Sequence, residues 1–159
     1  MDPRDLALDM ALAPEGDEPL FPLPELAERA GLSLPILEVL AREGLLIPRA
    51  EGPEPLYHPE DAEAVRAGLD LVGAGLPLAE LLAVARQADE AMRPVAEAAV
   101  DAFVRFVSDP AEGTARSEEE AAQRMVDAFE KMLPAAGRLV AHHFQSLLVD
   151  GARRRLRDD

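Results

Sequence analysis

The stretch that most constrains the fold runs from residue 24 to residue 46 and reads PELAERAGLSLPILEVLAREGLL. Gly31 tolerates the positive φ that a tight turn requires, and Ser33 is a residue type that caps the start of a helix. Gly44 is a residue type that commonly follows the end of a helix. The spacing therefore predicts two short helices joined by a tight turn, a helix-turn-helix whose second helix ends near Glu43.

Most of the remaining chain follows the apolar spacing of helices. Apolar residues recur three and four positions apart over 59–72, 78–107, 118–132 and 135–156. Residues 45–57 hold three prolines and a glycine, which favours a small irregular hairpin, or wing, over a helix. A proline inside a helix removes a backbone donor and obstructs the preceding turn. We therefore expect Pro94 to kink or split the 78–107 helix, and Pro134 to separate the last two helices.

Composition agrees with an all-α protein that carries a small β wing. Ala and Leu dominate, aromatic residues make up only 4% of the chain, and no alternating strand pattern occurs outside the wing. We expect three regions: a flexible acidic arm over 1–21, a winged helix-turn-helix over 22–76, and a helical dimerisation or sensor domain over 77–159. "SEEE" at residues 117–120 has the pattern of a helix-capping box, preceded by a loop over 108–116.

Several classes of site are disfavoured by residue content. The chain has no Cys, which excludes disulfides, thiolate metal sites and a Cys nucleophile. It contains no Gly-rich phosphate loop, no HExxH and no GxSxG, so we do not expect an enzyme. Its longest apolar runs are far shorter than the roughly 20 residues that span a bilayer, and no signal peptide is recognisable. We therefore expect a cytoplasmic protein without a membrane partner.

The distribution of charge is informative about DNA. The formal net charge is −15, and residues 1–76 hold five Arg against sixteen Asp and Glu. Affinity for nucleic acid rests largely on Lys and Arg that neutralise phosphates. The part of the chain with the helix-turn-helix pattern is therefore also its more acidic part, which disfavours DNA as a partner.

Residues 22–83 nevertheless resemble the N-terminal winged helix-turn-helix domain of MerR-type transcriptional regulators. The resemblance rests on "LAERAG", "REGLL", Pro48 and Arg49 entering the wing, Tyr57 leaving it, "PED" and "GLPLAEL". It implies a transcriptional regulator that binds DNA as a homodimer, with the 78–107 helix as the dimerisation helix. Arg42 and Arg49 would be the phosphate contacts.

The positions that face DNA in that family differ here. Its recognition helix usually carries a run such as Arg-Tyr-Tyr-Glu, and the same place reads Glu-Val-Leu-Ala at residues 38–41. Its wing usually carries Gly-Tyr-Arg, and here residues 52–55 read Gly-Pro-Glu-Pro. Between residues 23 and 57 there are three Arg against six Glu, which adds repulsion toward phosphate.

Residues 77–157, which end in "LVAHHFQSLLVDGARRRL", are similar to the regulatory domains of some actinobacterial class III adenylate cyclases. That resemblance implies a helical module that senses pH or binds a fatty acid or another apolar ligand. It gives the alternative function, a regulatory module that does not bind DNA. Candidate sensing or anchoring residues are Arg105, Arg138, His143 and Phe144.

His143 falls on or beside the apolar side of its helix, and partial burial would lower the proton affinity of its imidazole. A core histidine with satisfied hydrogen bonds is the plainer alternative. Neighbouring His142 points about 100° away, so the two imidazoles cannot face one metal ion. The basic cluster at 153–157 suits a solvated helix end, or a contact with phosphate or a partner.

Overall fold

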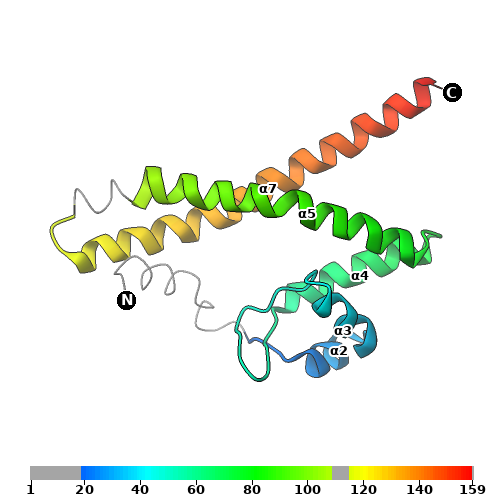
Figure 1. Ribbon diagram of the computed structural model, residues 1–159, viewed down its shortest axis with the longest axis horizontal. Helices are drawn as coiled ribbons and strands as arrows, with labels where there is room; N and C mark the ends of the chain where they lie inside the picture. Colours follow the sequence, from blue (N-terminus) through cyan, green and yellow to red (C-terminus); the bar gives the residue numbers. More distant parts are fainter. Residues whose placement is uncertain (1–18, 109–114, 159) are drawn as a thin grey trace. The chain divides into compact units, whose positions relative to one another are not determined.

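The computed structural model describes residues 19–108 and 115–158 of the chain. This part is mostly helical, which confirms the all-α class (Figure 1). Its elements are α2 (Leu23–Ala30), α3 (Leu34–Arg42), α4 (Pro59–Gly73), α5 (Leu78–Phe103), the π-helical turn η1 (Val104–Ser108) and α7 (Glu118–Asp158). The expected arm, up to residue 18, and residues 109–114 of the expected loop lie outside the described residues.

The described residues form two compact units, one ending at Val100 and the other beginning at Asp101. The first unit therefore includes most of α5, whereas the sequence placed a domain boundary at residue 76. The reason is that the first turns of α5 carry Leu78, Leu81 and Leu82, which lie against residues of α3 and α4 around a shared pocket. Among the described residues, no helix is both long and apolar enough to cross a membrane.

The turn between α2 and α3 has the predicted conformation. Gly31 adopts φ 62°, its N–H donates to the carbonyl of Glu28, and the N–H of Leu32 donates to the carbonyl of Ala27 at 2.9 Å. Gly44, which follows α3, likewise adopts a left-handed φ of 74°. Both glycines are used where a side chain would be strained. Ser33 occupies the expected position before α3, but its side chain makes no capping hydrogen bond.

A single apolar core holds α2, α3 and α4 together. Leu37 of α3 is fully buried in this cluster. The buried residues of the cluster come from α2, α3, α4 and the segments between them: Phe21, Leu26, Ala27, Leu37, Leu46, Tyr57, Ala62 and Val65.

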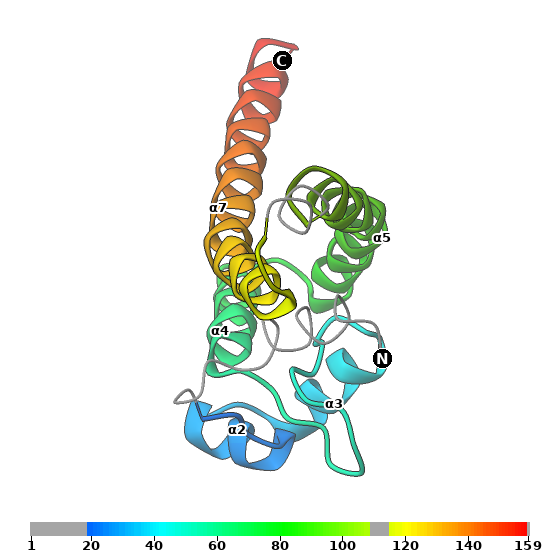
Figure 2. The same ribbon diagram turned by 90° about the vertical axis from the view of Figure 1, so that its left-hand side faces the viewer.

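The segment from residue 45 to residue 57 is an irregular loop beside α3 (Figure 2). Among the described residues, β-type pairing is limited to two isolated antiparallel bridges, Ala50 with Leu56 and Phe21 with Tyr57. The N–H of Leu56 donates to the carbonyl of Ala50 at 2.9 Å, which closes the loop. The second bridge fastens the end of the loop to the chain that enters α2.

Side chains also fix the start and the position of α4. The N–H of His58 donates to Asp61 Oδ2 at 3.0 Å, while His58 Nδ1 accepts from the N–H of Glu60 at 3.2 Å. Partial burial raises the pKa of Asp61, against the lowering effect of the hydrogen bond from the His58 backbone. Arg66 Nε donates to the carbonyl of Ala30 at 3.1 Å and so ties α4 to the end of α2.

The second unit is centred on two aromatic rings. Phe103 and Phe129 are almost fully buried, and their ring centroids lie 3.7 Å apart. Ala121 and Met125 on the first turns of α7 are buried as well. At the start of α7, Ser117 Oγ accepts from the N–H of Glu120 at 3.1 Å, as the capping pattern predicted. The Glu120 carboxylate accepts from the N–H of Arg116 rather than from that of Ser117.

The structure corrects the expectation about Pro134 and excludes a split at Pro94. α7 is one continuous helix through Pro134, so the predicted separation of two helices there is wrong. α5 also continues past Pro94 without being split. A proline in a helix removes one backbone hydrogen bond and crowds one carbonyl, and the intact bonds on either side keep these long helices continuous. Met132, the last residue of the apolar pattern over 118–132, is 40% exposed, although that pattern predicts that it faces inward.

Candidate functional site

The surface of α3 is where the sequence placed the DNA contacts. Arg42, in the last turn of α3, and Arg49, in the following loop, are both exposed. Glu38 on the same helix is exposed as well. The two expected phosphate contacts are therefore accessible, but they share this surface with carboxylates that repel phosphate.

Glu43, directly after α3, is engaged by an arginine of α5. The Arg86 guanidinium forms a two-point ion pair with this carboxylate, with Arg86 Nη2 donating to Glu43 Oε1 at 3.2 Å. The hydrogen bond from Arg86 is the main reason that the pKa of Glu43 lies below its ordinary value. The same bond raises the pKa of Arg86. Glu43 therefore carries a negative charge at neutral pH, and Arg86 is directed toward the protein rather than toward phosphate.

Arg93, two helical turns further along α5, holds the same loop. Its Nη2 donates to the carbonyl of Gly44 at 3.3 Å, and its Nε donates to Asp89 Oδ2 at 2.8 Å. A Cβ at Gly44 would meet Arg93 Nη2 at 3.4 Å, so a side chain there would crowd this contact. The roles of Arg86 and Arg93 are not visible in the sequence, because the residues that they contact after α3 lie 43 and 49 residues away along the chain.

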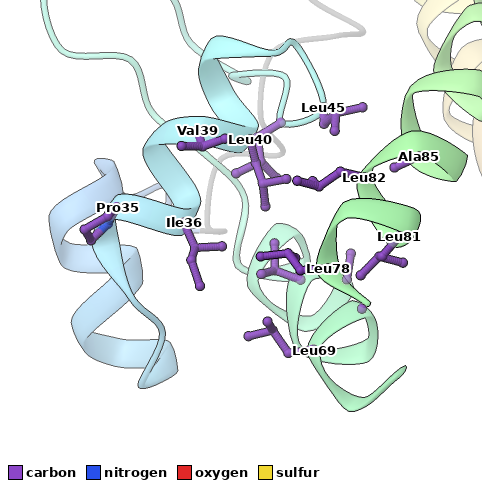
Figure 3. A pocket seen from close by; sticks show the side chains of 14 residues that line it. Pro35, Ile36, Val39, Leu40, Leu45, Leu69, Leu78, Leu81, Leu82 and Ala85 are labelled. Carbon is purple, nitrogen blue, oxygen red and sulfur yellow. The ribbon is translucent and has the colours of Figure 1, made fainter. Parts of the chain in front are cut away.

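Between α3, α4 and α5 the first unit encloses an open apolar pocket of about 430 Å³. Figure 3 shows Ile36, Val39 and Leu40 of α3 on one side, and residues of α5 on the other, with Leu82 pointing toward Leu40. The lining residues are all uncharged and apolar: Pro35, Ile36, Val39, Leu40, Leu45, Leu46, Ala64, Val65, Gly68, Leu69, Leu78, Leu81, Leu82 and Ala85.

The pocket exists because α4 and α5 place small residues beside large ones. Ala64, Gly68 and Ala85 leave space that a larger side chain would fill, while leucines line the walls. Its volume lies within the roughly 300–1,000 Å³ that is usual for small-molecule sites. Val39 and Leu40, the two large apolar residues of the 38–41 segment, line this pocket. The arrangement can remove an apolar group from water but offers no charged side chain to hold it.

Of the candidate sensing residues of the second unit, Arg105 lies in η1 and the other three lie on α7. Arg105 in η1 lies 6.0 Å from the ring centroid of Phe106. Within the described residues, no hydrogen bond, ion pair or ring contact joins Arg105 to Arg138, His143 or Phe144. All three of those α7 side chains are exposed. The partial burial expected for His143 is therefore not met, and its sensing role stays a prediction.

His142 is also exposed, and the two imidazoles lie on the surface of α7. Among the described residues, no group of three His, Asp or Glu side chains lies close enough together to bind a metal ion. No protein-family model matches the chain, and no curated protein matches it either.

Proposed function

We propose that this chain is a regulatory module that uses a MerR-like winged helix-turn-helix scaffold to bind an apolar ligand rather than DNA. The pocket between α3, α4 and α5 is the observation that carries the proposal. It lies against α3, the helix that would read DNA in a MerR-type protein, so a ligand there contacts that helix directly.

The charges around α3 support the same proposal. Glu38 and Glu43 are on or directly after this helix, and Glu43 is held as a carboxylate by Arg86. Glu51 and Glu54 are exposed in the loop that corresponds to the wing. A surface with several carboxylates loses the counterion-release term that dominates affinity for DNA. An apolar ligand needs no such term.

The apolar walls define the chemical class of the ligand. Leu78 is 41% exposed and Val39 is 36% exposed, although both line the pocket. Covering them would remove apolar surface from water, at about 25 cal/mol for each Å². No charged group lines the pocket, so a carboxylate or phosphate on the ligand would remain at its mouth, in water. We propose an aliphatic or aromatic molecule, of which a fatty acid is one example.

Binding of the neutral fluorescent probe N-phenyl-1-naphthylamine tests the proposal. Ala85→Phe places a large side chain in the pocket, and we expect it to weaken probe binding at least about tenfold, since the ring occupies the space for the ligand. Ala83→Phe is the matched control, because Ala83 is exposed on α5 and does not line the pocket. Equal probe affinity for the wild type and Ala85→Phe would refute the pocket as the binding site.

A second candidate is the transcriptional regulator implied by the family resemblance. The closed loop after α3 favours it, since the bridge between Ala50 and Leu56 fits a small wing with Arg49 beside it. DNA binding predicts that genomic fragments are retarded on a gel and that retardation weakens steeply with salt. Retardation that is lost in Arg42→Ala and Arg49→Ala would establish this candidate. No retardation at low salt would eliminate it.

A further inference from the structure

We propose that residues 133–151 of α7 pair with the same segment of a second copy of this chain, in antiparallel orientation. This inference goes beyond the proposed function, because the surface belongs to the second unit and does not involve the pocket. It also differs from the dimer implied by the family resemblance, which would use the 78–107 helix.

One side of α7 is apolar and free of charge over this segment. At 100° per residue, eight residues share about 120° of the helix circumference around Phe144. They are Leu133, Gly137, Val140, Ala141, Phe144, Leu147, Leu148 and Gly151. Phe144 is 45% exposed, Leu147 51% and Leu148 57%, and no residue from 130 to 158 is buried. A continuous apolar stripe of about 27 Å is the kind of surface that marks an interface.

The spacing within the stripe suits pairing with another helix. Residues 133, 137, 140, 144, 147 and 151 alternate steps of four and three, which is the spacing of a coiled-coil seam. An antiparallel register with its two-fold axis between residues 140 and 141 sets Phe144 of one copy against Gly137 of the other. The large ring then fills the space that the glycine leaves, and Val140 meets Ala141.

The opposite charges at the two ends of α7 favour pairing with a second copy in the antiparallel direction. The first turns of α7 carry Glu118, Glu119 and Glu120, and the last carry a basic cluster at residues 153–157. In this register residues 153–157 of one copy lie opposite residues 124–128 of the other, within about one helical turn of Glu120 and of Glu130, which is exposed. A parallel pair would instead set the two basic clusters side by side. Antiparallel helix dipoles add to the same preference.

The first experiment measures the mass of the full chain by sedimentation. We expect twice 17.1 kDa for the wild type. Leu147→Asp buries a carboxylate in the seam, and we expect it to raise the dissociation constant at least about 100-fold. Leu139→Asp is the matched control, because Leu139 is 71% exposed on the opposite side of α7. It should change the constant by no more than about threefold, as a neutral surface substitution does.

Three results of this experiment would overturn the proposal. One is a monomeric wild type, which means that the stripe is covered within one chain or by another partner. The second is a dimer that Leu147→Asp and Leu139→Asp weaken equally. The third is a dimer that survives Leu147→Asp but is lost in Val95→Asp, since Val95 is 57% exposed on α5 and would locate the interface there.

The second experiment tests orientation by spin labelling, which is clean because the chain has no Cys of its own. His142→Cys and Leu156→Cys place labels away from the stripe. In the antiparallel register the two copies of residue 156 are separated by about 46 Å along the helix axes, and those of residue 142 by about 5 Å. A long distance for Leu156→Cys with a short one for His142→Cys is expected. Short distances for both indicate a parallel pair and overturn the assignment.

Discussion

Leu37 offers the most direct test of the core formed by α2, α3 and α4. Its side chain is fully buried, at 0% exposure, among residues of α2, α4 and the segments that flank them. Truncation of an enclosed Leu to Ala loses its transfer free energy and leaves a cavity, and we expect Leu37→Ala to cost about 3–4 kcal/mol. A unit of about 80 residues has a free energy of unfolding of about 4–12 kcal/mol, so this is a large fraction of its stability.

The fluorescence of Tyr57 allows unfolding of this unit to be followed separately from the rest of the chain. It is the only tyrosine of a chain without Trp, and it is 5% exposed in the same core, so its fluorescence follows this core alone. With a urea dependence of about 1–2 kcal/mol per M, the midpoint of the fluorescence transition should fall by about 2 M in Leu37→Ala. Far-UV circular dichroism follows all the helices, so this transition should account for only part of its total change.

Ile47→Ala is the control for this measurement, because Ile47 is a large aliphatic residue that is 62% exposed in the same unit. We expect it to change stability by less than about 0.5 kcal/mol. A loss below about 1 kcal/mol in Leu37→Ala, or equal losses in the two variants, would refute the assignment of Leu37 to the centre of the core.

Three further outcomes are expected. Phe129→Ala removes the ring packed against Phe103 and should cost the second unit about 3–5 kcal/mol, seen as faster amide exchange at the start of α7. The pKa of Glu43, measured by NMR titration, should lie below its ordinary 4.5 and rise toward that value in Arg86→Gln. The ion pair of Glu43 with Arg86 stabilises the fold above pH 4.5, and this stabilisation is lost as pH falls through the lowered pKa. Burial raises the pKa of Asp61, so ionisation of this carboxyl opposes folding. The wild type should therefore lose stability relative to Asp61→Asn as pH rises from 3.8 through the raised pKa. Urea midpoints of the two proteins measure this difference.

Sequence analysis located the elements well where local chemistry decides them. The turn at Gly31, the end of α3 before Gly44 and the start of α4 depend on the backbone preferences and caps of neighbouring residues. Proline at residue 134 was misread, because its local cost was taken to end the helix. That cost is about 3 kcal/mol, and a helix of 41 residues has enough backbone hydrogen bonds on either side to continue.

The candidate site depended on contacts that the sequence does not display. Val39 and Leu40 could be recognised as unsuited to DNA, but not as walls of a pocket, because the facing wall is formed by Leu78, Leu81 and Leu82 about 40 residues later. The apolar stripe of α5 was visible as a helical pattern, and its spacing fits burial against any neighbouring helix. Only the packing of the three helices left a space between them.

What the sequence determined by itself is therefore the all-helical fold, the bounds of most helices and the acidic character around α2 and α3. These follow from spacing, capping and charge, which act between residues close in the chain. The tertiary structure decided that Arg86 pairs with Glu43, that α3, α4 and α5 enclose an apolar pocket, and that one side of α7 stays uncovered. Those properties arise between residues distant in the chain, where the fit of side chains in three dimensions, and not local preference, determines which groups meet.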